Sequence, residues 1–447
     1  MGASLLLVLV WLFVPADSAF TQTPNNTQAI LTEVSQLMAR RDFPAALALF
    51  DHIDKAALQT AEIQLLRAAV LNSAGRTADA RAIAAGITSK DPNNIDAILV
   101  LASAAAIEGK DREQRTLLER VIKLDPKNLK ALSDLGYIAL RAQSLRTAAG
   151  HFDKALAVDG SYREAMVGRA IVYRYANDPK KSEQMLNRAI RQNPQWAQPL
   201  NERARLYKGA GYLEDALKDL DEAKKIEPDN YWVSVDRAAT LIELGRKPEA
   251  LQELDHAIAL SPGSFLAYIY RAGIKDESGD YKGAERDYIT LIKLKPDYYF
   301  AAEGLGIIKM MNRQYTEARD AFLAAYRQAP REYHYALLAA INWMKASRQG
   351  DPKQFLAQVL KTVPRDSADW VILRLFHDLS GDGDAVARAE KEQNLDEKSK
   401  MLFYIAHYYD IRGSKALANT FFTMVQDMNR TGTIEWKINE MMLKEKN

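Results

Sequence analysis

The chain has 447 residues, of which 48% are hydrophobic and 26% are charged, the composition of an ordinary globular protein. Its 60 Lys and Arg residues nearly balance its 58 Asp and Glu residues, so the net charge is only +2 and argues against nucleic-acid binding. The absence of cysteine excludes disulfides, thiolate nucleophiles and zinc sites built on cysteine.

The N-terminal segment differs from the rest of the chain. Residues 3–14 are uncharged and almost wholly apolar, and this run is shorter than the roughly 20 residues that span a bilayer. Small residues that suit cleavage follow at Ala16, Ser18 and Ala19. We therefore expect a signal peptide over 1–19, a polar spacer over 20–26, and a periplasmic or secreted protein without membrane insertion after cleavage. No Lys or Arg precedes the apolar run, and an uncleaved helix or a buried core segment is the alternative.

A repeat with a period of 34 residues follows the spacer. It is marked by the prolines Pro92, Pro126, Pro194, Pro228, Pro262, Pro296, Pro330 and Pro364, with Gly160 in the one remaining place. If these residues are numbered as repeat position 32, position 8 is small in every repeat: Ala68, Ala102, Gly136, Ala170, Ala204, Ala238, Ala272, Gly306 and Ala340. Small side chains at a fixed position indicate that two helices approach closely there.

This pattern resembles the tetratricopeptide repeat, a helix-turn-helix unit of 34 residues. The best copy contains Leu132, Leu135, Gly136, Ala148, Phe152 and Ala155. The resemblance implies an all-α fold, a right-handed superhelical solenoid of about twelve units with a concave surface. Ten units are expected over 27–366, and degenerate and shifted units over 367–432. The segment 433–447 is expected to form a capping helix, because its apolar residues recur at helical spacing.

Five repeats carry arginine at position 7, and three of these have an acid sixteen residues later. Because a partly buried guanidinium needs a fixed acceptor, we expect ion pairs between the two helices of each unit. The expected pairs are Arg203 with Asp219, Arg237 with Glu253, and Arg271 with Asp287. An anion-binding row of arginines is the alternative, and Arg169, which lacks such an acid, is its best candidate.

Other chemically reactive side chains do not form a recognisable site. No two histidines have the i, i+4 spacing of a helical metal site, and His256 with Ser261 lacks an oxyanion hole. The run from Asp378 to Glu390 resembles a calcium loop, but its glutamate falls one residue late, so an inter-helix turn is expected there. We expect no catalytic residues, no metal and no cofactor.

The residues opposite the buried face of the first helix change from polar to aromatic along the chain. Aromatic anchors and adaptable methionines are typical of surfaces that bind peptides or helices. The expected groove residues are Trp196, Trp232, Tyr270, Tyr298, Phe300, Met311 and Met344. The sequence thus favours a non-catalytic interaction scaffold or adaptor of the cell envelope with a protein or peptide partner. The alternatives are packing of these residues between repeats, a homo-oligomeric assembly protein such as a homodimer, and an enzyme with an unrecognised site.

Overall fold

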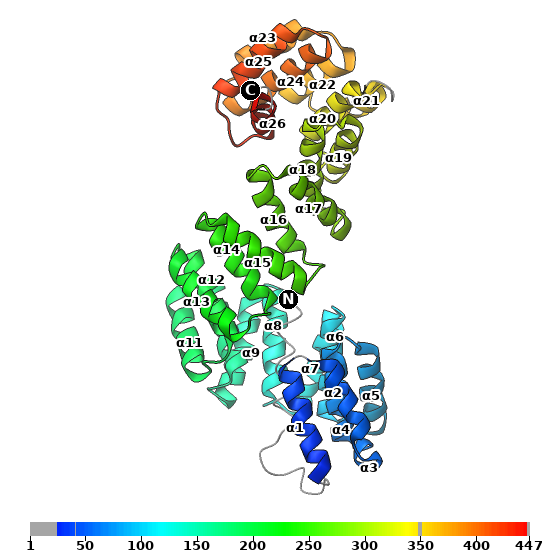
Figure 1. The fold of residues 1–447 in the computed structure, drawn as a ribbon, viewed down its shortest axis with the longest axis vertical. Coiled ribbons are helices and arrows are strands. Elements are labelled where there is room, and N and C mark those ends of the chain that lie inside the picture. Colours follow the sequence, from blue (N-terminus) through cyan, green and yellow to red (C-terminus); the bar gives the residue numbers. More distant parts are fainter. Residues whose placement is uncertain (1–24, 41, 347–350, 445–447) are drawn as a thin grey trace. The chain divides into compact units, whose positions relative to one another are not determined.

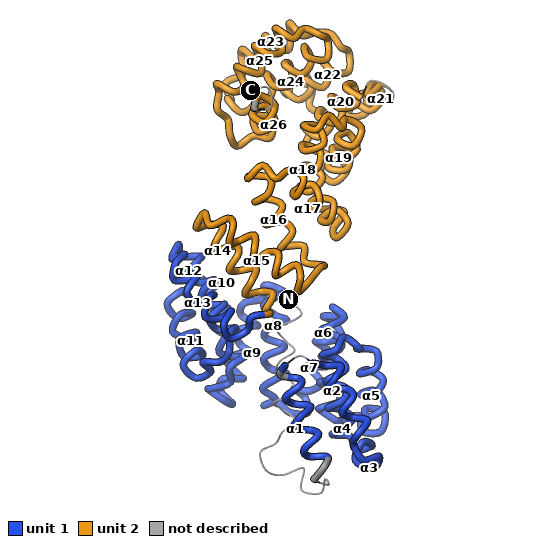
Figure 2. Tube along the Cα trace, viewed as in Figure 1, with its two compact units in different colours: residues 1–228 blue, residues 229–447 orange. Residues whose placement is uncertain are grey.

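The computed structural model describes residues 25–40, 42–346 and 351–444, and every regular element in these residues is a helix (Figure 1). The chain divides into two compact units, residues 1–228 and residues 229–447 (Figure 2). Each unit contains six successive helix pairs within the described residues, in agreement with the expected all-α array of about twelve repeats. The expected signal peptide over 1–19 lies outside the described residues. No helix in the described part of the chain is both long enough and apolar enough to cross a bilayer.

In the first unit, the first described helix begins at Asn25, inside the segment 20–26 that we expected to be a spacer. Its elements are α1 (Asn25–Ala39), α2 (Phe43–Leu49), the 3-10 helix η2 (Phe50–His52), α3 (Lys55–Leu58), α4 (Ala61–Ser73), α5 (Thr77–Lys90), α6 (Ile95–Ile107), α7 (Asp111–Leu124), α8 (Leu129–Arg141), α9 (Leu145–Val158), α10 (Arg163–Tyr175), α11 (Pro179–Gln192), α12 (Ala197–Gly209) and α13 (Leu213–Ile226).

The second unit continues the helix pairs and ends in a single helix. Its elements are α14 (Tyr231–Glu243), α15 (Lys247–Leu260), α16 (Phe265–Glu277), α17 (Tyr281–Leu294), α18 (Tyr299–Met311), α19 (Tyr315–Gln328), α20 (Tyr333–Lys345), α21 (Lys353–Leu360), α22 (Ala368–Asp378), α23 (Asp382–Lys391), α24 (Leu395–Ile411), α25 (Lys415–Asp427) and α26 (Ile434–Lys444).

Local signals at two repeat positions define the helix ends. In the pairs whose position 15 the structure describes, the turn between the two helices has a left-handed backbone at this position, so glycine is favoured there; Gly75 and Gly109 are examples. Position 34 caps the next helix: the Asn94 side chain accepts a hydrogen bond from the Ala97 amide at 3.0 Å. The same cap recurs at Asn128, Asn230 and Ser264, so both signals repeat in several units of the chain.

Close packing around Phe152 explains the glycine at position 8 of its own repeat and the glycine at position 6 of the next repeat. The Phe152 ring on α9 is fully buried between Gly136 on α8 and Gly168 on α10. A Cβ atom would lie 2.6 Å from this ring if added to Gly136, and 2.3 Å from it if added to Gly168. The ring therefore occupies the space that side chains at these two positions would need.

The C-terminal helix α26 packs on α24 and α25, as expected of a capping helix. Its Ile438 side chain is fully buried, and the side-chain amide of Asn439 donates a hydrogen bond to the backbone carbonyl of Phe422 at 2.9 Å. The buried Glu435 carboxylate accepts a hydrogen bond from the Tyr404 hydroxyl at 2.9 Å, and burial raises the pKa of Glu435. These contacts hold α26 firmly against the last helix pair.

Candidate functional site

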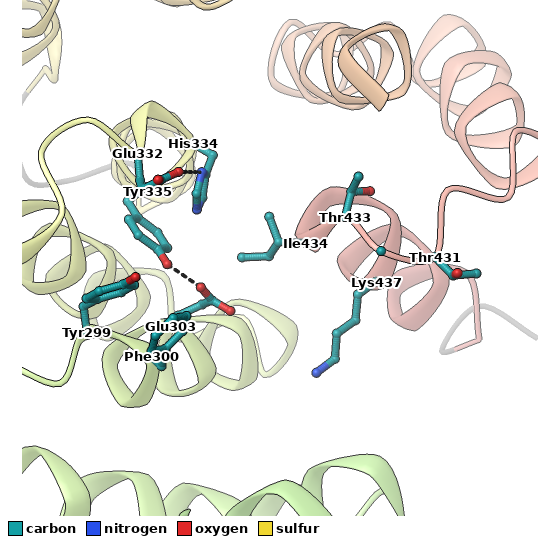
Figure 3. A pocket seen from close by; sticks show the side chains of 11 residues that line it. Tyr299, Phe300, Glu303, Glu332, His334, Tyr335, Thr431, Thr433, Ile434 and Lys437 are labelled. Atoms are coloured by element: carbon teal, nitrogen blue, oxygen red, sulfur yellow. Dashed lines mark hydrogen bonds and ion pairs between the residues drawn. The ribbon is translucent and has the colours of Figure 1, made fainter. Parts of the chain in front are cut away.

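A cavity of about 470 Å³ lies in the second unit, between α18, α20 and α26 (Figure 3). One wall comes from two successive repeats and the other from the C-terminal segment. The lining residues are Tyr299, Phe300, Glu303, Glu332, His334, Tyr335, Thr431, Gly432, Thr433, Ile434 and Lys437. The cavity therefore combines aromatic rings with charged and hydroxyl groups.

The aromatic part of the wall is built at the first turn of α18. The rings of Tyr299 and Phe300 lie with their centroids 4.2 Å apart at an interplanar angle of 31°, and Tyr298 lies 5.6 Å from Phe300. Phe300 is nevertheless 51% exposed. An exposed phenylalanine beside a cavity offers an apolar contact surface to a ligand.

A carboxylate and a phenol meet inside the cavity. The Tyr335 hydroxyl donates a hydrogen bond to Glu303 (Figure 3). Burial is the main cause that raises the pKa of Glu303, and the nearby carboxylates of Asp276 and Glu332 raise it further. The hydrogen bond from Tyr335 and the Lys437 ammonium oppose this rise. Glu303 is thus a partly desolvated acid among other acids.

His334 stands beside this acid cluster as a neutral group. Burial and the Lys400 ammonium lower the pKa of His334 to about 4, so its imidazole is uncharged near neutral pH. Its Nδ1 atom lies 3.5 Å from Glu332 Oε2. The histidine therefore adds a ring and a hydrogen-bonding nitrogen to the cavity but no positive charge. Within the described residues, no group of three or more His, Asp or Glu side chains is arranged to hold a metal ion.

The opposite wall comes from the C-terminal helix. Ile434 points into the cavity from the start of α26, and Lys437 lies one turn further along the same helix (Figure 3). Lys437 Nζ lies 2.8 Å from Asp276 Oδ2 at the end of α16, 161 residues earlier in the chain. The helix thus caps the last pair and also reaches a repeat near the start of its unit.

The expected groove residues have different surroundings. Phe300 lines the cavity, and the Tyr298 ring contacts the Phe300 ring. Met311 is only 8% exposed and belongs to the hydrophobic core, because position 13 of α18 faces the packed interior. Half-buried positions are occupied by Trp196, Trp232, Tyr270 and Met344, and Met344 packs against the same core.

The sequence analysis did not select most of the cavity residues. Glu303 and Tyr335 occupy positions 5 and 3 of their repeats, which we had not assigned to the groove. Ile434 and Lys437 belong to a helix that we expected only to cover the last repeat. No sequence signal indicates that Asp276 contacts Lys437 on that helix, because the two residues are 161 positions apart.

The arginines at position 7 lie beside the expected acids. The ion pairs join Arg203 Nη2 to Asp219 Oδ1 at 2.6 Å, Arg237 Nη1 to Glu253 Oε1 at 2.8 Å, and Arg271 Nη2 to Asp287 Oδ1 at 2.6 Å.

The same arginines also contact the preceding repeat. Arg203 donates a hydrogen bond to Asn187, and Arg271 pairs with Asp255, at 2.5 and 2.6 Å respectively. Arg169, our candidate for anion binding, pairs with Asp153 of the preceding repeat at 2.7 Å. The guanidinium of Arg169 is therefore already neutralised. Position 23 of its own repeat carries no acid, and position 25 of the preceding repeat supplies one instead.

Comparison with known proteins agrees with this repeat organisation. The sequence profile described as Tetratricopeptide repeat matches residues 31–95, 115–165 and 271–333. No curated protein sequence matches the chain.

The solved structures to which the chain is similar include the following three. The APC/C hetero-tetramer Cut9-Hcn1 is 13% identical, with a TM-score of 0.53, and the match covers 70% of this chain and 62% of that one. The Pseudomonas aeruginosa pilF structure is 19% identical, with a TM-score of 0.42 and coverage of 46% and 95%. YrrB, described as a TPR protein with an unusual peptide-binding site, is 17% identical, with a TM-score of 0.29 and coverage of 41% and 95%.

The match to Cut9-Hcn1 extends over most of the chain and shows a shared fold. The sequence profile recognises the repeat in both halves of the chain. Together with the successive helix pairs, these findings show that tetratricopeptide repeats lie in residues 31–95, 115–165 and 271–333 and that the fold is a helical-repeat array.

Proposed function

We propose that the chain is a non-catalytic protein–protein interaction scaffold of the cell envelope that binds a peptide or a helix of a partner protein. Repeat arrays of this kind present extended surfaces, because each helix pair contacts only its neighbours and leaves one face open. The fold supports a binding role of this general kind, and the cavity between α18, α20 and α26 supports its location.

The observation that carries the proposal is the exposure of Phe300 at this cavity. Its ring is held in place by Tyr298 and Tyr299, yet half of its surface remains open to solvent. A rigid aromatic side chain of this kind loses little conformational entropy when a partner covers it. Such residues supply much of the binding energy of protein interfaces.

The first test removes this ring. We expect Phe300→Ala to reduce recovery of the partner by about tenfold, because truncation of an aromatic anchor costs more than 1 kcal/mol at many interfaces. The measurement is affinity capture from envelope extract with the full chain as bait, followed by quantitative mass spectrometry. Purified bait proteins are first compared by circular dichroism to show that they are equally folded.

A matched control is available in the first unit. Tyr212 is 62% exposed and does not line the cavity, so Tyr212→Ala should leave recovery unchanged. Equal recovery of every partner by Phe300→Ala and by the unaltered chain would contradict the proposal. Recovery of nothing but further copies of the chain would identify the aromatic surface as a self-interface.

Export is a separate part of the proposal, and it rests on the sequence of residues 1–19. We expect the protein produced in its own cells to lack this segment and to begin near Phe20, because an apolar run followed by small residues suits signal-peptide cleavage. Mass spectrometry of the N-terminal peptide of the mature protein, purified from fractionated cells, is the measurement. An intact N-terminus on protein from the cytoplasmic fraction would contradict export.

A further inference from the structure

We propose that the cavity between α18, α20 and α26 binds a single cationic side chain, a lysine or an arginine, of the partner segment. This inference rests on the proposed function and specifies the chemistry of the bound segment.

The charges at the cavity are mainly negative. Glu303 and Glu332 line it together with a single ammonium group, that of Lys437. Lys437 is already paired with a third carboxylate, Asp276, at 2.8 Å. A second cation would therefore meet the Glu303 carboxylate, whose pKa is raised by burial and by the nearby carboxylates of Asp276 and Glu332.

The aromatic wall also suits a cation. Tyr299 and Phe300 present ring surfaces beside Glu303, and the Tyr335 ring stands on the other side of this carboxylate (Figure 3). A cation within about 6 Å of an aromatic ring centroid is attracted by about 0.5–2 kcal/mol, with the larger value in desolvated sites. The aliphatic part of a lysine or arginine side chain can pack against the same rings.

The position of Lys437 provides an independent observation. Its ammonium group comes from a distant part of the chain and is held by Asp276, a carboxylate close enough to the lining residue Glu303 to raise its pKa. The intramolecular pair shows that this surface accepts a lysine at ion-pair distance. The cavity offers Glu303 and Glu332 to a second cation supplied from outside.

An anionic partner fits the cavity less well. It would approach the carboxylates of Glu303 and Glu332, and His334 would not compensate because its low pKa keeps it neutral near pH 7. An aliphatic side chain would cover the rings but would leave Glu303 desolvated without a counterion, which is unfavourable.

The test begins with selection of peptides from a random peptide display library on the purified full chain. Peptides that lose binding to Phe300→Ala are kept, because these contact the cavity. We expect lysine or arginine to be enriched among them at one position. One such peptide and its variant with norleucine at that position are then titrated calorimetrically against the chain and against Glu303→Gln.

The four affinities form a double-mutant cycle. Norleucine should weaken binding to the unaltered chain by about tenfold but should have little effect on binding to Glu303→Gln, because both changes remove the same charge pair. Glutamine retains the acceptor oxygen for Tyr335, so the variant keeps the local hydrogen bond. Glu317→Gln, an exposed change of the same charge on α19, should leave all affinities unchanged.

The affinity should also depend on pH. Because the pKa of Glu303 is raised, lowering the pH from about 8 to about 5 should protonate part of Glu303 and weaken binding of the cation. The dependence should be smaller in Glu303→Gln, in which only the surrounding groups titrate. The groups around Glu303 are Asp276 from α16, Tyr288 from α17, Tyr298 and Tyr299 at the start of α18, Glu332 and Tyr335 near the start of α20, and Lys437 from α26.

The outcomes separate this inference from the proposed function. Peptides that require Phe300 but show no cationic enrichment, or no coupling to Glu303, would overturn the cation site and leave peptide binding intact. A selection that returns no peptide dependent on Phe300 would overturn both. Cationic enrichment with strong coupling to Glu303 supports both.

Discussion

Replacing Arg203 with methionine should lower the local free energy of unfolding of α12 and α13 by about 3–5 kcal/mol, the cost of removing one partner from a buried ion pair. Arg203 donates through both Nε and Nη2 to the two oxygens of Asp219, at 2.8 and 2.6 Å. The Asp219 side chain is only 9% exposed, so the remaining carboxylate cannot recover its solvation in water. Hydrogen exchange of the amides of α12 and α13, read by mass spectrometry on the full chain, measures this loss.

Arg169 provides the matched control. It occupies the same repeat position, but its partner Asp153 is 55% exposed. The carboxylate left by Arg169→Met therefore returns to water, and we expect a loss of at most about 1 kcal/mol. Equal losses for the two variants would show that the burial of the acid does not set the cost. A double variant, Arg203→Met with Asp219→Leu, should recover much of the stability by removing the unpaired charge.

The second large effect concerns the glycines around Phe152. Gly168→Ala should lower the free energy of unfolding around α9 and α10 by about 1–2 kcal/mol, because overpacking costs about 1–3 kcal/mol and the higher helix propensity of alanine offsets less than 1 kcal/mol. The reason is steric: the new Cβ would lie 2.3 Å from the Phe152 ring, which must move. Urea denaturation combined with hydrogen exchange of these two helices is the measurement.

Two further variants isolate the steric cause. Phe152→Leu should rescue Gly168→Ala, because a leucine leaves room for the new methyl group, and the pair should be strongly non-additive. Gly150→Ala, on the same helix as Phe152 and with open space around its Cα, should instead stabilise α9 by up to about 1 kcal/mol. A stabilising effect of Gly168→Ala would show that the helices adjust at no cost.

The repeat period, the helix type and the close approach at position 8 could be predicted from sequence, because each signal recurs in neighbouring repeats. The choice between alanine and glycine at position 8 has a reason visible only in the structure. Glycine occurs there at Gly136 and Gly306, which face the rings of Phe152 and Phe322. Repeats with leucine on the second helix keep alanine, as in Ala204 with Leu220. Side chains that meet between helices thus compensate one another in size.

The start of α24 illustrates why the C-terminal part was harder to predict. We expected degenerate and shifted units over 367–432, and this helix does not follow the 34-residue period. It begins at Leu395, because Asn394 accepts hydrogen bonds from the amides of Asp396 and Glu397. This cap gives α24 a length of 17 residues. An irregular repeat has no neighbour from which its boundaries can be inferred.

The candidate site was the least predictable part, for a related reason. Phe300 was recognisable because an aromatic residue replaced the polar residues at the same position of earlier repeats. Glu303 and Lys437 were not, because their importance depends on where α26 lies, and no repeat pattern specifies the position of a single terminal helix.

The contact between Lys437 and Asp276 also bears on how the protein is made. Contacts between neighbouring repeats can form as soon as each pair leaves the ribosome, since they join residues close in sequence. The partner of Asp276 is synthesised 161 residues later, almost at the end of the chain. The repeats from α16 onward therefore remain without this contact, and without the second wall of the cavity, until α26 has been synthesised.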